Sequence, residues 1–287
     1  MTIQTVALIG FGEVGKVLAA DLPEHLTVTV FDSHATKLDM PGRATARGSA
    51  AEAARDADLV ISAVTAAQTL AAAQSVQSGL KAGAWYMDLN SASPEAKIAA
   101  GRIIASATGR YVETAIMSPI GPKRLASPML LGGPWAQDFA PVIQALGFTG
   151  AQFYSDVPGK ASATKLCRSV MIKGLEALIS ESLLSARYYG VEDTVLESLN
   201  NLFPHPDWSA YARYMISRTL EHGTRRAEEM EEAARTVAGA GLTPWMALAT
   251  VERQAWAPDF AEALTQDDLK AMLDSIRQQL THKDAAE

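Results

Sequence analysis

The chain has 287 residues, of which 48% are hydrophobic and 20% are charged, and its formal net charge at pH 7 is −7. This length suits one large domain or two of ordinary size, and the composition is typical of a globular protein with a sizeable core. The negative charge argues against the basic surface that nucleic-acid binding requires, so a small molecule is the expected partner.

Cysteine content and hydropathy bear on the compartment. Cys167 is the only cysteine, so no intramolecular disulfide is expected, and the five scattered histidines lack metal-ligand spacing. The first residues lack the basic start and apolar core of a secretory signal. No uncharged apolar run approaches the roughly 20 residues that span a bilayer. We therefore expect a cytoplasmic protein with no bound metal and no membrane contact.

Up to about residue 157, short apolar segments alternate with segments of helical length. The sequence predicts strands at residues 5–10, 26–32, 58–64, 84–90, 111–117, 128–133 and 151–155. It predicts helices at residues 13–22, 66–80, 94–107 and 134–146. Strands separated by helices of this length are typical of parallel βαβ units. Residues 1–157 are therefore expected to form an α/β domain with a mostly parallel sheet.

The turn between the first strand and the first helix has the sequence GFGEVG. In a dinucleotide-binding turn, Gly10 permits the tight bend, Gly12 lets a pyrophosphate approach the backbone, and Gly15 lets the helix pack against the strand. The helix N-terminus adds N–H groups and a partial positive charge. The alternative is an ordinary glycine turn in an α/β protein without a nucleotide. We expect a phosphate-binding turn made of Gly10, Phe11, Gly12, Glu13, Val14 and Gly15.

The second predicted strand ends in an acid, Asp32, which lies 20 residues beyond Gly12. A carboxylate there accepts hydrogen bonds from the ribose diol of NAD and repels the 2′-phosphate of NADP. The nearest following cations are Lys37 and Arg43, and no arginine follows the acid directly. NAD is therefore the expected cofactor, with NADP as the alternative.

Two further turns follow the ends of predicted strands. Ligands of open α/β sheets lie beyond the carboxyl ends of the strands, so residues in these turns are expected to face the cofactor. These residues are Ala63, Val64, Thr65 and Asn90. Ser91 and Ser93 follow in the second turn, and they are alternatively N-caps for a helix that begins near Pro94.

From about residue 158 the strand-like segments disappear and helical periodicity takes over. Pro158 and Gly159 mark the junction, and breaks at residues 188–194, 201–208 and 239–245 suggest about six helices. Residues 158–287 are therefore expected to form an all-α domain.

The first helix of this second domain carries a narrow polar stripe on an otherwise apolar surface. On a helical wheel of ~100° per residue, four polar side chains fall within roughly 80° of Lys165. They are Ser169, Lys173, Glu176 and Ser180. One interpretation is that the stripe faces water, as on any amphipathic helix. The other is that it lines a cleft between the two domains, where ligand sites concentrate.

In their order along the chain, these motifs resemble those of the β-hydroxyacid dehydrogenase superfamily, which includes 3-hydroxyisobutyrate and 6-phosphogluconate dehydrogenases. After GFGEVG and the acid, DLNSASP is similar to the family's Ser/Thr–Pro loop, and GKASATKLCRS is similar to its GxGxxxKxxxN. The blocks IMSP, KLCRSVMIKGLEAL and HGTRRAEEMEEA resemble a branch with its own phosphogluconate-dehydrogenase-like C-terminal domain. The resemblance implies an N-terminal Rossmann domain, a helical substrate domain and homodimers formed through the C-terminal helices.

The resemblance places Lys165 on the family's catalytic lysine. When an alcohol is oxidised by NAD, the hydroxyl proton goes to a base, and a lysine with a lowered pKa can accept it near neutral pH. Ser169 stands where the family has an asparagine that holds substrate, and it can bind a hydroxyl or carboxylate. Lys173 is expected to bind an anionic group of the substrate or to pair with Glu176.

The block ETAIMSPIGPKRLASPMLLGG stands where the family has its substrate loop, DAPVSGG, and a downstream GG. The serine of that loop has no clean equivalent, because Ile116 or Met117 takes its place. The neighbouring Ser118 and Pro119 are therefore the expected substrate contacts in this loop.

A second group of cations lies in HGTRRAEEMEEA. His222 and Arg225 are candidates for a clamp on an anionic substrate. The alternative is an exposed helix face, because acids and arginines alternate there at helical spacing.

The sequence thus predicts an NAD-dependent oxidoreductase that transfers a hydride between nicotinamide and a small hydroxy acid or its phosphate, with Lys165 as general acid and base. One alternative is an imine reductase, although those enzymes usually carry Asp or Tyr at the position of Lys165. The other is a non-catalytic NAD-sensing protein.

Overall fold

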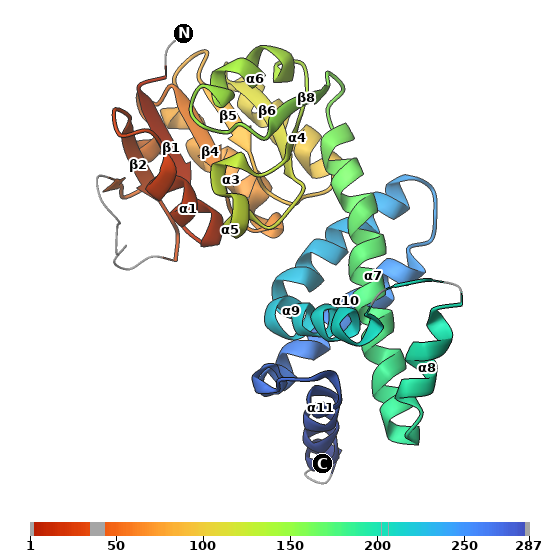
Figure 1. Cartoon of the computed structure of the whole chain (residues 1–287). Helices are drawn as coiled ribbons and strands as arrows, with labels where there is room; N and C mark the ends of the chain where they lie inside the picture. The colour runs from red at the N-terminus through yellow and green to blue at the C-terminus, as the bar shows by residue number, and fades with distance from the viewer. Residues whose placement is uncertain (1–2, 35–43, 202, 206, 285–287) are drawn as a thin grey trace. The chain divides into compact units, whose positions relative to one another are not determined.

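The computed structural model describes residues 3–34, 44–201, 203–205 and 207–284, with side chains described up to Thr281. The chain divides into two compact units, Met1–Leu166 and Cys167–Glu287 (Figure 1). The division falls inside one helix, α7 (Lys160–Tyr189). The expected domain boundary between residues 157 and 158 stays a prediction. Lys37 and Arg43, the cations considered for NADP, lie outside the described residues.

The first unit is built on an eight-stranded sheet with the order β3-β2-β1-β4-β5-β6-β7-β8. The strands are β1 (Thr5–Ile9), β2 (Thr27–Phe31), β3 (Thr45–Ala46), β4 (Leu59–Ser62), β5 (Trp85–Asp88), β6 (Arg110–Ile116), β7 (Met129–Gly132) and β8 (Ala151–Ser155). Strands β6 and β7 pair antiparallel, and the other neighbours pair parallel. The predicted α/β domain with a mostly parallel sheet is confirmed.

Helices cover both faces of this sheet because its strands are buried on both sides. Leu8 and other residues of one face pack on α1 (Glu13–Asp21) and α6 (Ala136–Gln144). Ala7 and other residues of the opposite face pack on α2 (Ala50–Ala54), α3 (Thr69–Val76) and α4 (Pro94–Ser106). Alternate strand residues point to opposite faces, so strands such as β1 contribute side chains to the hydrophobic core on each face of the sheet.

Short elements complete the first unit. They are the helix α5 (Ile120–Lys123) and the 3₁₀ segments η1 (Ala66–Gln68), η2 (Gln77–Gly79) and η3 (Arg124–Ala126). Strand β3 and helices α2 and α5 are additions to the predicted elements. They have only two, five and four residues, too few to display a hydrophobic period.

The described part of the second unit is helical, as predicted. It continues α7 and adds α8 (Glu192–Leu199), α9 (Trp208–Gly239), α10 (Trp245–Trp256), the 3₁₀ segment η4 (Ala257–Thr265) and α11 (Leu269–Asp284). The expected breaks have local causes. Gly190 takes a φ of 69° after α7, and the Oδ1 of Asp207 caps α9 by accepting the N–H of Ala210 at 2.8 Å. No helix in the described part of the chain is both long and apolar enough to cross a membrane.

Candidate cofactor and catalytic site

The glycine turn joins β1 to α1 and is tied to the end of β2. The N–H of Gly10 donates to the carbonyl of Phe31 at 2.9 Å, and the N–H of Phe11 donates to Oδ2 of Asp32 at 2.7 Å. Gly10 has a φ of 97°, and a Cβ there would lie 2.4 Å from the carbonyl oxygen of Ala63. Glycine is therefore required at residue 10 for this close approach of two loops.

The other two glycines of the turn differ from each other. A Cβ added to Gly12 would meet no atom within 4 Å, whereas one added to Gly15 would lie 2.2 Å from the carbonyl oxygen of Gly10. Gly15 is thus needed for the turn itself, rather than only for packing of the helix on the strand. Gly12 is the N-cap of α1 and supplies no side chain to cap it. The open backbone and uncapped helix N-terminus fit a phosphate group.

The remaining residues of the turn have different surroundings. Phe11 is buried in the core and Val14 packs partly against it, so their backbone rather than their side chains is available to a ligand. Glu13 is exposed in the first turn of α1.

Asp32 follows β2 and braces the glycine turn. Its Oδ2 accepts the N–H of Phe11, and its Oδ1 accepts the N–H of His34 at 2.8 Å. The side chain is 21% exposed. Each carboxylate oxygen can accept a second hydrogen bond, so the acid can also receive a ribose hydroxyl.

Asn90 and the turn Ala63–Val64–Thr65 lie side by side at the carboxyl ends of β5 and β4. The Oδ1 of Asn90 accepts the N–H of Val64 at 2.8 Å, and its Nδ2 donates to Oγ of Ser62 at 3.0 Å. Asn90 is 3% exposed. Its side chain holds the adjacent turn in place, a role that the sequence did not predict. We call residues 10–15, Asp32, Ala63–Thr65 and Asn90 the cofactor strip.

Lys165 lies next to the end of this strip. Its Nζ donates to Oγ of Ser91 at 2.6 Å, and Ser91 directly follows Asn90 in the chain. Ser93, not Ser91, is the N-cap of α4, and its Oγ accepts the N–H of Ala96 at 3.4 Å. A small pocket surrounds the lysine, lined by Asn90, Ser91, Ala92, Lys97, Glu113, Thr114, Ala115, Ser162, Lys165 and Leu166. The structure therefore brings the predicted base and the predicted cofactor residues together within one unit.

Next to Asn90 lies a buried network of hydrogen bonds and one ion pair around Asp88, which sequence reasoning missed. Lys97 is 1% exposed, and its Nζ donates to Oδ1 of Asp88 at 2.7 Å. The hydroxyl of Tyr111 donates to Oδ2 of Asp88 at 2.7 Å, and the N–H of Asn90 donates to Oδ1 at 2.9 Å. Burial, and next the charge of Asp88, raise the pKa of Tyr111, which keeps it a neutral donor. The available signal was an acid that ends an otherwise uncharged strand.

Glu113 in β6 is the second missed residue. It is 1% exposed, and its carboxylate accepts the N–H of Gly159 at Oε2 and the N–H of Ala161 at Oε1, both at 2.7 Å. These N–H groups lie at the start of α7, the helix that carries Lys165. A charged residue within a buried strand was the signal that could have pointed to it.

Ser118 and Pro119 follow the carboxyl end of β6. Because β6 pairs parallel with β5, this end lies on the same edge of the sheet as Asn90. Ser118 is partly exposed and its hydroxyl donates to the carbonyl of Pro119 at 3.3 Å, while Pro119 is exposed.

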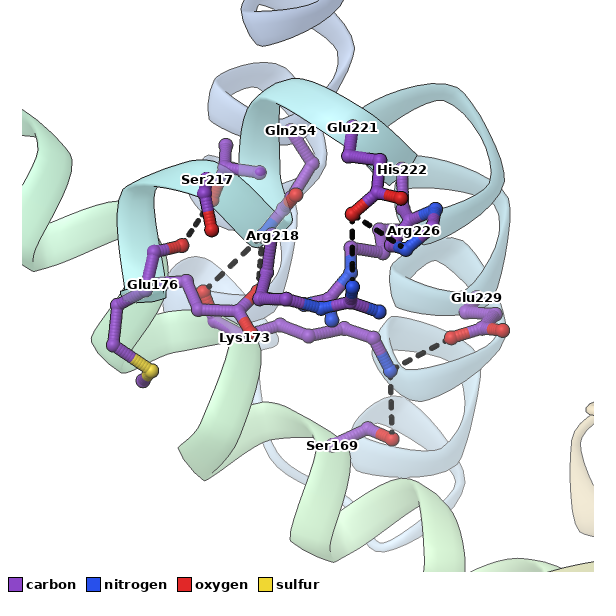
Figure 2. A network of polar contacts seen from close by, with 12 residues as sticks. Ser169, Lys173, Glu176, Ser217, Arg218, Glu221, His222, Arg226, Glu229 and Gln254 are labelled. Carbon is purple, nitrogen blue, oxygen red and sulfur yellow. Dashed lines mark hydrogen bonds and ion pairs between the residues drawn. The ribbon is translucent and has the colours of Figure 1, made fainter. Parts of the chain in front are cut away.

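Ser169 and Lys173 lie in the second unit, within the polar network drawn in Figure 2. Lys173 is 8% exposed, and its Nζ lies 2.7 Å from Oε2 of Glu229 and 3.1 Å from Oγ of Ser169. Arg225 donates to the other oxygen of Glu229 at 2.8 Å. Burial lowers the pKa of Lys173, against the opposing effect of Glu229. The interpretation that the polar stripe of α7 faces water is wrong, because Ser169, Lys173, Glu176 and Ser180 are buried.

Glu176 does not pair with Lys173, which corrects the expected alternative. Its carboxylate pairs with Arg226 of α9 and accepts a hydrogen bond from Nε2 of Gln254 in α10 at 3.2 Å (Figure 2). His222 is 22% exposed and lies 3.3 Å from Oε2 of Glu221. The two candidates for an anion clamp, His222 and Arg225, are therefore each next to an acid of α9 itself. No group of three His, Cys, Asp or Glu side chains in the described residues is arranged to hold a metal ion.

Comparisons with known proteins match both units. The family model described as the NAD binding domain of 6-phosphogluconate dehydrogenase matches residues 5–147, and a domain of unknown function, DUF1932, matches residues 186–257. A conserved hypothetical protein from Sinorhizobium meliloti 1021 is 34% identical, with a TM-score of 0.75 over 96% of this chain and 97% of that one. A search of curated proteins finds no match.

Two further solved structures are similar. The conserved protein MTH1747, of unknown function and described as structurally similar to 3-hydroxyacid dehydrogenases, is 28% identical. Its TM-score is 0.67 over 88% of this chain and 97% of that one. A 3-hydroxyisobutyrate dehydrogenase from Mycobacterium tuberculosis, solved with L-serine, has a TM-score of 0.71 over 96% of this chain and 100% of that one. At 17% identity it shares the fold.

Proposed function

Because the chain belongs to the β-hydroxyacid dehydrogenase superfamily of NAD(P)-dependent oxidoreductases, we propose that it transfers a hydride between NAD and a small hydroxy acid or its phosphate. One observation carries the proposal. The amine of Lys165 lies 2.6 Å from the hydroxyl of Ser91, at the end of the cofactor strip. A base at this place is next to the carboxyl ends of the strands, where such sheets bind their ligands.

The residues of the cofactor strip fit the dinucleotide. In the proposal, the uncapped start of α1 and the open side of Gly12 receive the pyrophosphate, and Asp32 receives the ribose hydroxyls. NAD, when bound, supplies the carbon that accepts the hydride. Asn90 acts through the protein, by holding Val64 and its turn in place.

Lys165 has the chemical role in this proposal. Its amine accepts the proton of the substrate hydroxyl during oxidation and returns a proton to the carbonyl oxygen in the reverse direction. As an ammonium it also stabilises negative charge that develops on that oxygen. Ser91 accepts a hydrogen bond from Nζ and so orients the amine toward the pocket.

Each unit carries candidate substrate contacts of its own. Ser118 and Pro119 follow β6 on the same edge of the sheet as Asn90, which supports a role against the substrate. In the second unit, His222 and Arg225 are 22% and 51% exposed and can meet an anionic group. Ser169 and Lys173 are buried, and we assign them to the interior of the network that supports this surface.

Substitution of Lys165 tests the proposal. Lys165→Ala is expected to lower kcat by about 10²- to 10⁴-fold, the usual contribution of general acid–base catalysis, with NADH affinity nearly unchanged. Ser91→Ala is expected to lower kcat about fivefold, because one lost hydrogen bond is worth about 1 kcal/mol. The assay is NAD reduction across hydroxy acids of three to six carbons and their phosphates, with NADH binding followed by fluorescence.

Three results would decide against parts of this assignment. Turnover of cyclic imines with none of hydroxy acids would favour an imine reductase. No turnover on any substrate, together with an unchanged Lys165→Ala variant, would favour an NAD sensor. Tighter binding of NADPH than of NADH would contradict the role given to Asp32.

We also propose that the protein is a homodimer formed through its C-terminal helices. The support is a set of large apolar side chains that are at least half exposed on α7, α9 and α10: Met171, Leu178, Tyr188, Tyr189, Tyr214, Trp245, Met246 and Leu248. Light scattering is expected to give twice the chain mass of 30.5 kDa, about 61 kDa. Trp245→Glu is expected to weaken the dimer, while Trp135→Glu in the first unit leaves it intact. A mass of one chain at micromolar concentration would contradict the dimer.

A further inference from the structure

Glu113 is an acid in the middle of β6, a strand that is otherwise nearly all buried. Its carboxylate is 1% exposed and accepts two backbone N–H groups, those of Gly159 and Ala161, each at 2.7 Å. Both N–H groups lie at the start of α7, where the helix itself offers no acceptor. A side chain from the sheet therefore caps this helix, and the negative charge meets the positive end of the helix dipole.

The neighbouring strand makes room for this carboxylate. Gly132 of β7 pairs directly with Glu113 across the antiparallel ladder. A Cβ added to Gly132 would lie 2.4 Å from Oε1 of Glu113, so any larger residue would push the carboxylate off the helix. Glu113 thus binds the start of α7, and Gly132 on the adjacent strand leaves the space that its carboxylate occupies.

Lys165 lies one helical turn beyond this cap. It follows Ala161 by four residues, so the hydrogen bonds of the capped turn set the position of the lysine backbone. Glu113 and Lys165 also line the same small pocket. Without the cap, the first turn of α7 would fray, and the amine would lose its fixed place against Ser91.

We propose that Glu113 is a positioning residue for Lys165: by capping α7 it holds the amine where the reacting hydroxyl is deprotonated. The inference rests on the proposed function of Lys165. A displacement of a catalytic group by about 1 Å can lower the rate on the order of 100-fold, so loss of the cap should have a measurable effect on kcat.

The first experiment compares Glu113→Gln with a matched control. Gln keeps the shape but presents an NH₂ group toward the helix start and loses the charge. Its kcat is expected to fall on the order of 10- to 100-fold, with the KM for NAD nearly unchanged. Gly132→Ala, which crowds the same carboxylate, is expected to reproduce the effect, and Glu113→Asp to recover part of it. Glu95→Gln, which changes an exposed acid in the first turn of α4, is expected to behave like the wild type.

A double-mutant cycle separates positioning from general destabilisation. If Glu113 acts through Lys165, Glu113→Gln adds no further loss of turnover to Lys165→Ala. An additive loss would overturn the inference and leave the proposed function standing.

A second readout does not depend on activity. The modification of each lysine by an amine-reactive ester is followed by mass spectrometry. Glu113→Gln and Gly132→Ala are expected to speed the modification of Lys165 by about threefold or more, because the capped turn opens more often. The exposed Lys123 serves as the internal reference and is expected to react at the same rate in all variants. Unchanged modification of Lys165 in both variants would overturn the inference, whatever the activity of Lys165→Ala.

Discussion

At the scale of single residues, the glycine turn separates a structural requirement from a binding requirement. Gly10 and Gly15 each have a backbone carbonyl oxygen within 2.4 Å of the place where a Cβ would be. Gly12 has open space on that side. Gly10 and Gly15 are thus needed to fold the turn, whereas the fold alone does not require glycine at residue 12. A bound phosphate would require it.

This difference predicts opposite results for two alanine variants. Gly15→Ala is expected to lower the free energy of unfolding by about 1–3 kcal/mol through overpacking and to abolish NADH binding with it. Gly12→Ala is expected to leave the free energy of unfolding within about 0.5 kcal/mol and to weaken NADH binding at least about tenfold. Urea unfolding without cofactor and fluorescence titration with NADH measure the two effects. Unchanged NADH affinity in Gly12→Ala would contradict the phosphate site.

The two serines after Asn90 indicate how far the sequence reaches at this scale. Pro94 at the start of α4 favours Ser93 as the cap, and the structure agrees. That leaves Ser91 without a local role, but nothing local indicates that its partner is Lys165, 74 residues further along the chain. Contacts of this kind depend on how strands and helices assemble, and a single sequence does not display them.

At the scale of elements, α7 reverses the usual arrangement of an amphipathic helix. Its polar stripe is buried against α9 and α10, while Met171 and Leu178 are 64% and 55% exposed. The wheel correctly groups the polar residues, because the 3.6-residue period is local. It does not indicate which side faces inward, because the partners of Lys173 and Glu176 in α9 and α10 lie 50 residues or more away along the chain.

Burial of Lys173 predicts a large cost for its removal. Lys173→Met removes a buried cation from the partly buried Glu229, whose pair with the half-exposed Arg225 stays, so the free energy of unfolding is expected to fall by about 3 kcal/mol. Lys270→Met removes an exposed pair with Asp193 and is the matched control, with little expected change. Urea unfolding of both variants measures the difference. A raised KM in Lys173→Met at unchanged stability would instead make Lys173 a direct substrate contact.

At the scale of the whole molecule, the first unit carries its candidate site and a charged structural contact at opposite ends of its strands. The cofactor strip and Lys165 lie at the carboxyl ends of the strands. At the amino ends, Asp58 precedes β4 and accepts the N–H groups of Gln4 and Thr5 at 2.9 and 3.2 Å. Lys81 adds an ion pair with the same carboxylate at 2.7 Å. The alternation of strands and helices predicted a mostly parallel sheet, but this division of charge follows only from the assembled sheet.

Asp58 therefore predicts a pH dependence of stability without an effect on catalysis. Burial alone raises its pKa, but hydrogen bonds from Lys81, Gln4 and Thr5 outweigh burial and lower the pKa below 3.8. With a lower pKa in the folded state, the unfolded chain binds the proton more tightly. The carboxylate thus stabilises the fold above about pH 4, and this contribution is lost as the pH falls through the folded-state pKa.

The variant Asp58→Asn tests this directly. Its free energy of unfolding at pH 7 is expected to be about 1–2 kcal/mol lower than that of the wild type, since a charged acceptor of three hydrogen bonds is replaced by a neutral one. The difference is expected to shrink below pH 4, where the wild-type acid takes up its proton, while kcat at pH 7 stays unchanged because Asp58 lies at the opposite edge from Lys165. Urea unfolding at pH 7, 5 and 3 follows the difference. A gap between the two proteins that is the same at pH 3 as at pH 7 would mean that the loss comes from the NH₂ group of Asn, which cannot accept these hydrogen bonds, and not from the missing charge.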